Sequence, residues 1–569
     1  MGLKGQHTLP RQKGVMKLKL WIAGDGDTLR KIADKANVRI EDLIALNPYI
    51  SAPDLNISGR PVKLPSSTGS ITKQISPFPH SCPPPTIPSD YLTQWIPLTS
   101  LEEMAETEYD VLIVGTGAGG GAVLWRLCEQ WQNNGKRIGI IERGDLLLPT
   151  QARNLPTMDN ERLNRLFESV SHPLPGSFPD YSGGRQLFAL GGRTLFWNTI
   201  SPRMSLSELA SWPVSYDEMD AYYRIAEEIM NVSRNYTKGS STTEILLERL
   251  QGIGYPESMP VPMAADLRSR LYAERDTDVF FSTMVFLAQA LNRRPIDLAV
   301  RANAVRVLAD KGTVTGLHVM SSDKKTYCLK AKNVVLSAST FETPRLLLHS
   351  GIQGNAIGHY LSNQSLIVTR GKMSIEEFPD VSGTIGILIP GTEKRPYQIQ
   401  LRGPGNFDWY QTFQDKPYMQ ELEMTLFAFG KVEPRFANKV TLDPHKKDEY
   451  GVPEIRVQLS YSETDISIIR QTITALNHMV SALGITSISM NGQSDVCLMP
   501  RGILHHDSGT CRMGDDPLTS ATNRYGQIHG VSGLYVADNS VLPSAGTANV
   551  TLTTVALAIR TADTIIRQE

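Results

Sequence analysis

The sequence lacks a long apolar run, a dominant charge and a regular cysteine pattern. No part of the 569-residue chain reaches roughly 18 consecutive apolar residues, the length that a membrane-spanning helix needs, so no span is expected. The formal net charge is −1, which argues against electrostatic capture of nucleic acid. The five cysteines are scattered and form no C-x-x-C pair, so neither a disulfide framework nor a metal site is expected.

The N-terminal residues also lack the apolar core of a secretory signal peptide. We therefore expect a cytoplasmic protein. Nothing in the sequence decides the oligomeric state.

Residues 16–66 have the pattern of a small separate unit: a strand, two amphipathic helices and a closing strand. Asp27 or Thr28 can cap the first helix, and Asn47-Pro48 ends the second. The unit resembles a LysM module in three motifs, namely GDTL at 26–29, LNP at 46–48 and the closing G-x-P-x-x-L-P at 59–65. The resemblance implies a βααβ fold that binds glycans containing N-acetylglucosamine, with association to a cell wall or spore. A docking or oligomerisation role without a glycan stays open.

Residues 67–104 are rich in proline and serine and show no sustained period. Such segments act as semi-rigid spacers, so a linker is expected here. The chain after it has the pattern of one large α/β body.

A nucleotide-binding fingerprint opens this body. The apolar run YDVLIVG leads into a G-x-G-x-x-G loop at Gly115, Gly117 and Gly120, followed by a helix. The glycines allow the tight turn, the approach of a pyrophosphate and close packing of helix and strand. Glu142 ends the next strand, where an acid can bond ribose hydroxyls. The fingerprint alone does not distinguish NAD from FAD.

A second acid lies near the C-terminus. The short apolar strand 534–537 ends at Asp538, and a long helix follows with Leu552, Val555, Ala556 and Ile559 on one face. An acid brought back to the cofactor from so far along the chain favours a long ligand such as FAD. Asp538 could instead cap a turn.

The chain from 109 to 569 resembles the glucose–methanol–choline (GMC) oxidoreductases. Five motifs carry the resemblance: the GTGAGG loop, NVVLSASTFETPRLLLHSGI at 333–352, the segment 430–457, HDSGTCRMG at 506–514 and GLYVADNSVLP at 533–543. The resemblance implies a Rossmann-like FAD-binding domain and a substrate domain built on an antiparallel sheet, α/β and α+β overall. We expect the FAD-binding domain at 105–165, 290–365 and 500–569, and the substrate domain at 166–289 and 366–499.

Within this family, LGGRTLFWNTISPR at 190–203 resembles the flavin-contacting segment of pyranose oxidases, in which a histidine is joined covalently to the flavin. Phe196 stands at that position, so the resemblance implies noncovalent FAD. TANVTLTTVALAI at 547–559 is similar to the end of the same enzymes, with Val550 where proline is usual. The cofactor residues implied are Gly115, Gly117, Ala118, Gly119, Gly120, Glu142, Arg143, Gly192, Phe196, Trp197, Asn198, Thr199, Asp538, Asn549, Val550 and Thr551.

Two adjacent histidines, His505 and His506, precede the Gly509-Thr510 motif. By the family pattern His506 is the catalytic base, and Asn549 is its partner at the reacting oxygen. An imidazole can take the hydroxyl proton as carbon gives hydride to flavin N5. Successive side chains diverge, so His505 should point elsewhere. A metal site at 505–507 is not expected.

The sequence thus predicts an FAD-dependent oxidoreductase that converts a secondary hydroxyl of a sugar or glycoside to a ketone, with O2 or another electron acceptor. The sugar assignment rests on the pyranose oxidase-like segments and on the carbohydrate context of the LysM-like unit. Three alternatives stay open: a GMC oxidase or dehydrogenase of a non-sugar alcohol, a glycan-binding coat protein with an inactive oxidoreductase body, and a lyase whose flavin does no redox work.

Overall fold

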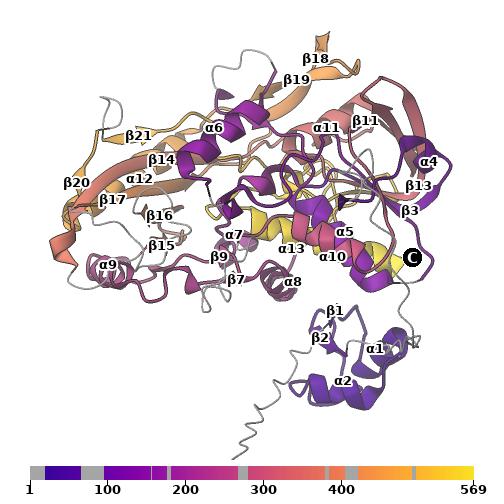
Figure 1. Ribbon diagram of the computed structural model, residues 1–569, viewed down its shortest axis with the longest axis horizontal. Coiled ribbons are helices and arrows are strands. Elements are labelled where there is room, and N and C mark those ends of the chain that lie inside the picture. The colour runs from indigo at the N-terminus through magenta and orange to yellow at the C-terminus, as the bar shows by residue number, and fades with distance from the viewer. Residues whose placement is uncertain are drawn as a thin grey trace, which may run out of the picture. The chain divides into compact units, whose positions relative to one another are not determined.

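The computed structural model describes residues 19–65, 95–132, 134–155, 157–175, 181–266, 280–378, 384–403, 421–489 and 495–568. The chain divides into two compact units, Met1–Tyr91 and Leu92–Glu569 (Figure 1).

The first unit contains a βααβ module, as predicted from the sequence. Strands β1 (Lys19–Ile22) and β2 (Pro61–Leu64) pair antiparallel, and helices α1 (Leu29–Ala36) and α2 (Ile40–Leu46) lie between them in the chain. Thr28 caps α1 by accepting a hydrogen bond from the N–H of Lys31 at 3.3 Å. Apolar side chains from both helices and from β2 form its core.

The second unit contains a mostly parallel sheet. Strand β3 (Glu108–Val114) lies between β4 (Ile138–Ile141) and β13 (Thr326–Leu336), parallel to both. Strand β10 (Asp297–Ala299) extends the sheet beyond β4, and β22 (Leu534–Val536) pairs with β13. These strands bring the glycine loop, Glu142 and Asp538 to one edge, since the carboxyl ends of parallel strands lie together. Strands β12 (Thr313–Ser321) and β11 (Ala302–Asp310) continue antiparallel.

Helices α5 (Ala118–Trp131), α10 (Met284–Leu291) and α13 (Thr551–Gln568) pack together in this unit (Figure 1). A buried ion cluster joins α5 to α13, because Arg126 lies 2.7 Å from both Glu129 and Asp563. A buried charge is tolerated when it is paired in this way. The first residues of α5 and α13 both contribute to the site described below.

A second sheet is antiparallel, as expected for the substrate domain. Its order is β20 (Thr486–Ser487), β14 (Gln364–Ser374), β17 (Glu421–Lys431), β16 (Tyr397–Gly403), β15 (Ile385–Ile389) and β8 (Met259–Pro260), with β21 (Val496–Leu498) also paired to β14. Helices α12 (Glu463–Ala482) and α9 (Ser241–Gly252) pack against it. The core between these helices and the sheet combines alternate strand residues with apolar residues of both helices.

Three smaller elements bear on the site. Helix α6 (Asn160–Val170) and helix α11 (Ser339–His349) contribute to its wall, and strands β18 (Lys439–Lys447) and β19 (Pro453–Gln458) form a hairpin in contact with α11. Helix α4 (Leu101–Ala105) also belongs to the second unit, since it packs on β13. This unit thus begins at Leu92, inside the segment 67–104 that was expected as linker. The other expected domain boundaries stay predictions.

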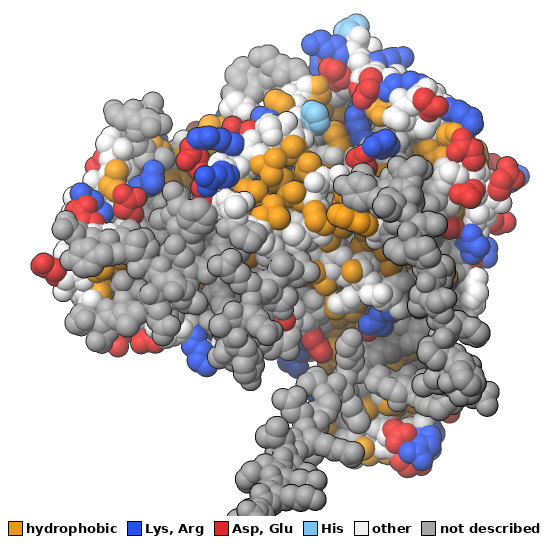
Figure 2. Space-filling view, in the orientation of Figure 1, with side chains coloured by type: hydrophobic (Ala, Val, Ile, Leu, Met, Phe, Trp, Pro, Cys, Tyr) orange, Lys and Arg blue, Asp and Glu red, His pale blue; other side chains and the backbone are white. Residues whose placement is uncertain are grey.

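The described surface carries charges of both signs. On the face drawn in Figure 2, basic and acidic side chains are intermixed. Among the described residues, no helix is both long and apolar enough to cross a membrane.

Candidate active site

A cavity of about 790 Å³ lies in the second unit, between the parallel sheet and the antiparallel sheet. Its wall includes the glycine loop and Glu142 from the first sheet, and Leu366, Phe427 and Phe429 from the second. The two histidines and Asn549 also line it. Motifs that are hundreds of residues apart in the chain therefore meet around one space.

The glycine loop is shaped to receive a ligand. A Cβ atom on Gly117 would meet no atom within 4 Å, so open space lies over this residue. A Cβ on Gly119 would lie 1.6 Å from the carbonyl oxygen of Ala537, and one on Gly120 would lie 1.9 Å from that of Gly115. Gly117 thus leaves room for a pyrophosphate beside the start of α5, whose free N–H groups attract anions. The other two glycines permit close packing.

Glu142 lines the cavity and organises the loop. Its Oε2 accepts hydrogen bonds from the N–H and the hydroxyl of Thr116 at 3.1 and 2.7 Å, and its Oε1 accepts one from the N–H of Gly144 at 2.9 Å. Burial raises the pKa of this carboxyl. A carboxylate has about four acceptor positions, so one remains for a ribose hydroxyl. Thr116 in turn accepts from the N–H of Gly191, which ties the segment 190–199 to the glycine loop.

Asp538 also lines the cavity, but its carboxylate is occupied by the protein itself. It accepts hydrogen bonds from the N–H and hydroxyl of Ser540, the N–H of Ser339 and the hydroxyl of Thr343. This is the capping role that the sequence left open. A contact of its carboxylate with the cofactor stays a prediction.

The segment 190–199 forms part of the wall. Phe196 packs with Phe167 of α6 at 5.5 Å between ring centroids, and the indole N–H of Trp197 donates to the carbonyl of Phe281 at 2.7 Å. Arg153 donates to the carbonyl of Trp197 at 2.9 Å and to the side chain of Asn198. The structure thus places Phe196, Trp197 and Asn198 at the cavity.

Two predicted cofactor residues do not reach the cavity wall. Gly120 packs against the backbone of Gly115, as its close Cβ contact shows. Thr199 is fully buried, with a left-handed φ of +57° that turns the chain behind the wall. Their expected contact with the cofactor stays a prediction. The other residues predicted to bind the cofactor all line the cavity.

The ring of His506 is oriented by Gln364 of β14. Its Nδ1 lies 2.8 Å from Gln364 Oε1. The amide nitrogen of the same glutamine donates to the carbonyls of Ala545, Gly546 and Ala548, at 3.2, 3.1 and 2.9 Å, so its oxygen must face the histidine. His506 Nδ1 is then the protonated nitrogen, and Nε2 carries the free lone pair. This is the tautomer that a base needs.

Asn549 is oriented in the same way by two glutamines of β16. Its Oδ1 accepts hydrogen bonds from the amide nitrogens of Gln398 and Gln400, at 3.0 and 2.8 Å. Arg402 donates to the oxygen of Gln400, which fixes that amide. The amide N–H2 of Asn549 has no partner among the described residues and is available to a ligand oxygen. None of the three glutamines was predicted from the sequence.

Helix α13 begins at Thr551, two residues after Asn549. Val550, which lies between them, also lines the cavity. The N–H of Val550 donates no hydrogen bond among the described residues, and a proline there would lack this donor. The positive end of the helix dipole stabilises negative charge that develops near it.

The electrostatic environment keeps His506 neutral. Burial, together with the positive charges of Arg402 and Arg193, lowers the pKa of its imidazole to about 4. A proton acceptor is therefore present at neutral pH. Among the described residues, no group of three or more His, Cys, Asp or Glu side chains could hold a metal ion.

His505 has a different setting. Its backbone is left-handed, with φ of +56°, and its ring packs against Phe167 of α6 at 5.2 Å. His506 instead contacts Gln364 and lies 6.1 Å from the ring of Phe429 on β17. Both rings border the cavity, but they contact opposite elements. Burial lowers the pKa of His505 well below its usual range.

The GMC oxidoreductase profile matches this chain at residues 176–366 and 434–558, together more than half of its length. The chain belongs to the GMC oxidoreductase family. A LysM domain profile matches residues 24–65, which confirms the N-terminal module. Membership in this family makes the protein an alcohol or sugar oxidoreductase with FAD as its cofactor.

Individual relatives are distant. A C-glycoside 3-oxidase of Arthrobacter globiformis is 25% identical over 67% of this chain and 74% of its own length. A 2-methyl-1,2-propanediol dehydrogenase of Mycolicibacterium austroafricanum is 25% identical over 81% of this chain and 95% of its own. The solved structure of pyridoxine 4-oxidase from Mesorbium loti matches 81% of this chain and 100% of that one, with a TM-score of 0.59 at 14% identity. This last likeness shows a shared fold.

Proposed function

We propose that this GMC oxidoreductase oxidises a secondary hydroxyl of a sugar or glycoside to a ketone. One observation carries the chemistry: Gln364 holds a proton on His506 Nδ1, which leaves Nε2 as an acceptor in the cavity that Asn549 also lines. A base and a hydrogen-bond donor for the same hydroxyl oxygen are thus available in one space.

In the proposed reaction, each residue of the site has a separate role. When bound, the flavin supplies the hydride acceptor. His506 Nε2 takes the hydroxyl proton, and the imidazolium is then stabilised by its Nδ1–H bond to Gln364. The amide N–H2 of Asn549 holds the same oxygen in line for reaction. Residues 115–120 and Glu142 hold the nucleotide, while the start of α13 favours negative charge near Asn549 and Val550.

Three observations support a sugar over a simple alcohol. The relative from Arthrobacter globiformis is named for the oxidation of a glycoside. The segments 190–203 and 547–559 resemble pyranose oxidases. The rings of Phe427 and Phe429 line the cavity on the side of the antiparallel sheet, and such rings suit the apolar face of a sugar. The LysM module is proposed to bind a glycan with N-acetylglucosamine, which would place the enzyme at a cell wall or spore.

We further propose that FAD is held without a covalent bond. Phe196 lines the cavity and its arene has no atom that could form such a linkage. The electron acceptor that regenerates the flavin is O2 or another carrier.

Anaerobic addition of substrates to the yellow holoenzyme tests the function. Sugars and glycosides are expected to bleach the flavin absorbance, and the ketone is identified by mass spectrometry. Bleaching only by simple alcohols or diols would favour the non-sugar alternative, to which the propanediol dehydrogenase relative points. A purified protein without colour would favour an inactive body, and substrate conversion without bleaching would favour a lyase.

A further inference from the structure

The turn between β18 and β19 is built around Asp448. Its Oδ1 accepts hydrogen bonds from the backbone N–H groups of Tyr450 and Val452, at 2.9 and 3.0 Å. Gly451 supplies a φ of +76°, and the N–H of Asp448 donates to the carbonyl of Val452 at 2.9 Å. The turn 448–452 is therefore a pre-shaped unit rather than a loose loop.

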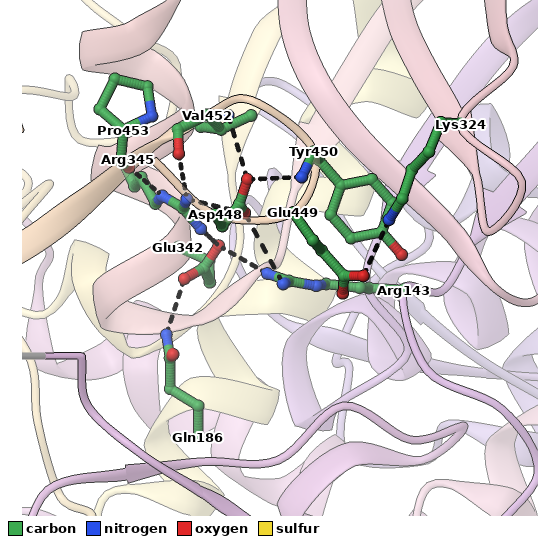
Figure 3. Close-up of polar contacts among 10 residues, drawn as sticks. All are labelled: Arg143, Gln186, Lys324, Glu342, Arg345, Asp448, Glu449, Tyr450, Val452 and Pro453. Atoms are coloured by element: carbon green, nitrogen blue, oxygen red, sulfur yellow. Dashed lines mark hydrogen bonds and ion pairs between the residues drawn. The ribbon is translucent and has the colours of Figure 1, made fainter. Parts of the chain in front are cut away.

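Arg345 of α11 fastens this turn to the nucleotide-binding part of the chain (Figure 3). Its guanidinium donates to Asp448 Oδ2 at 2.8 Å, to the carbonyl of Val452 at 3.0 Å and to the carbonyl of Pro453 at 2.7 Å. It also donates to Glu342 at 3.0 Å. Arg345 is only 6% exposed, so these hydrogen bonds form away from solvent, where they are strongest.

Arg143 is held by the same group of acids. Its guanidinium lies 3.4 Å from Glu342 Oε2 and 3.8 Å from Asp448 Oδ2. It also lies 4.0 Å from the ring centre of Phe188 and 5.4 Å from that of Tyr450. On the outer side of the turn, Lys324 pairs with Glu449 and lies over the Tyr450 ring, as Figure 3 shows.

This group borders the nucleotide end of the cavity. Arg143 directly follows Glu142, which is suited to bond the ribose, and the wall here includes Arg143, Phe188, Glu342, Arg345, Leu346 and Val452. Val452 comes from the hairpin, so the turn itself forms part of this wall. The turn therefore borders the part of the cavity that lies beside Arg143.

We propose that the turn 448–452 is the outer wall of the subsite for the adenosine end of FAD, and that Asp448 is the positioning residue that fastens it. Arg143, stacked on Phe188, faces the adenosine group directly. The cofactor leaves only when the contacts of Asp448 with Arg345 and Arg143 are broken. The inference rests on the nucleotide site and not on the substrate, so its test needs no turnover.

The test compares FAD release from holoenzyme variants. Asp448→Asn keeps an acceptor for the N–H groups of the turn but removes the charge that faces the two arginines. A hydrogen bond to a charged group contributes roughly a 10- to 100-fold factor to an equilibrium, so release should be faster by about that factor. Release is followed by flavin fluorescence in the presence of an excess FAD-binding apoprotein as trap. The difference in melting temperature between holoprotein and apoprotein should also shrink.

Asp443→Asn is the matched control. Asp443 lies on the same hairpin, accepts from the N–H groups of His445 and Lys446, and pairs with Arg456 at 2.9 Å. Unlike Asp448, it forms no ion pair with Arg345 or Arg143 among the described residues. This variant should release FAD at the unaltered rate. Equal release from Asp448→Asn and the unaltered protein would overturn the proposal, as would equal acceleration by both variants. If Asp448→Asn does not fold, Tyr450→Ala replaces it, with several-fold faster release expected and an unchanged rate overturning the proposal.

Discussion

His506, the proposed base, can accept a proton only while its ring is neutral. Gln364 fixes which nitrogen carries hydrogen, while burial and two arginines keep the ring neutral. Asn549 is fixed by a parallel arrangement of Gln398 and Gln400. The proposed base and its partner are therefore each held by buried amides that do not line the cavity, which fixes their rotamers before substrate arrives.

Alanine variants of the two histidines and Asn549 test these roles. His506→Ala should slow flavin reduction by roughly 100- to 10,000-fold, the usual contribution of a general base, with little change in bound FAD. Asn549→Ala should slow the same step by a smaller factor. His505→Ala should alter stability more than chemistry, because its ring packs on α6. Anaerobic stopped-flow measures all three, and a loss of reduction in His505→Ala alone would reverse the assignment of the base.

The pH dependence of flavin reduction follows from the pKa of His506. A pKa of about 4 means that the neutral base is present above that value and is lost as pH falls through it. The reduction rate should thus be flat between about pH 6 and 8 and fall only in acid. Arg402→Gln removes a positive charge and should raise this pKa. The acidic fall of the pH–rate profile, called the acid limb, should then move upward by about one pH unit. Arg402→Lys keeps the charge and should leave the limb in place; an unmoved limb in both variants would mean that burial alone sets the pKa.

Among the individual site residues, those in contiguous motifs were predictable from the sequence. The glycine loop and His506 lie in short patterns with fixed spacing, so their chemistry could be inferred from the sequence. Gln364, Gln398 and Gln400 could not, because polar residues in strands are common and their roles depend on strand register. The same holds for the Asp448 turn, whose letters KDEYG indicate a turn but not its contact with Arg345.

Among the elements, the start of α5 offers the sharpest test of the nucleotide site. Ala in place of Gly117 meets no protein atom, so Gly117→Ala should fold normally yet bind FAD at least about tenfold more weakly, because its methyl group fills the space for the pyrophosphate. Equilibrium binding of FAD to apoprotein measures this. Gly252→Ala, at the end of α9 with equally open space, is the control and should bind FAD normally. Normal binding by Gly117→Ala would place the phosphates elsewhere.

The segment 190–199 carries the prediction on covalency. Since Phe196 borders the cavity where a histidine would be needed for linkage, denaturation by acid should release all yellow colour into the supernatant. Absorbance of the supernatant and pellet at the flavin bands measures the partition. Colour that stays with the precipitated protein would show a covalent bond at another residue.

The order of the helices and strands along the chain was predictable from periodicity and motif order. Which of them pack against one another was not. The βαβ unit around β3, α5 and β4 and the C-terminal strand and helix matched their sequence patterns. Helix α4 lies on β13 inside a stretch rich in proline and serine, because its Ser100–Glu103 capping box and apolar Leu101 and Met104 outweigh the composition around it. Local composition does not report such long-range packing.

For the whole molecule, the division into two compact units predicts that the chemistry does not need the LysM module. Every described residue that lines the cavity lies between Val114 and Thr554, and the second unit begins at Leu92. A chain that lacks residues 1–66 should therefore fold, bind one FAD and be reduced by substrate at the rate of the full chain. It should at the same time lose retention on insoluble glycans with N-acetylglucosamine, which the full chain is expected to bind. Sedimentation with chitin or peptidoglycan and anaerobic stopped-flow measure the two properties on the same preparations.

Loss of flavin from a soluble truncated chain would mean that the module or the following segment supports the catalytic unit. Equal glycan retention by both chains would remove the carbohydrate-binding role from residues 16–66.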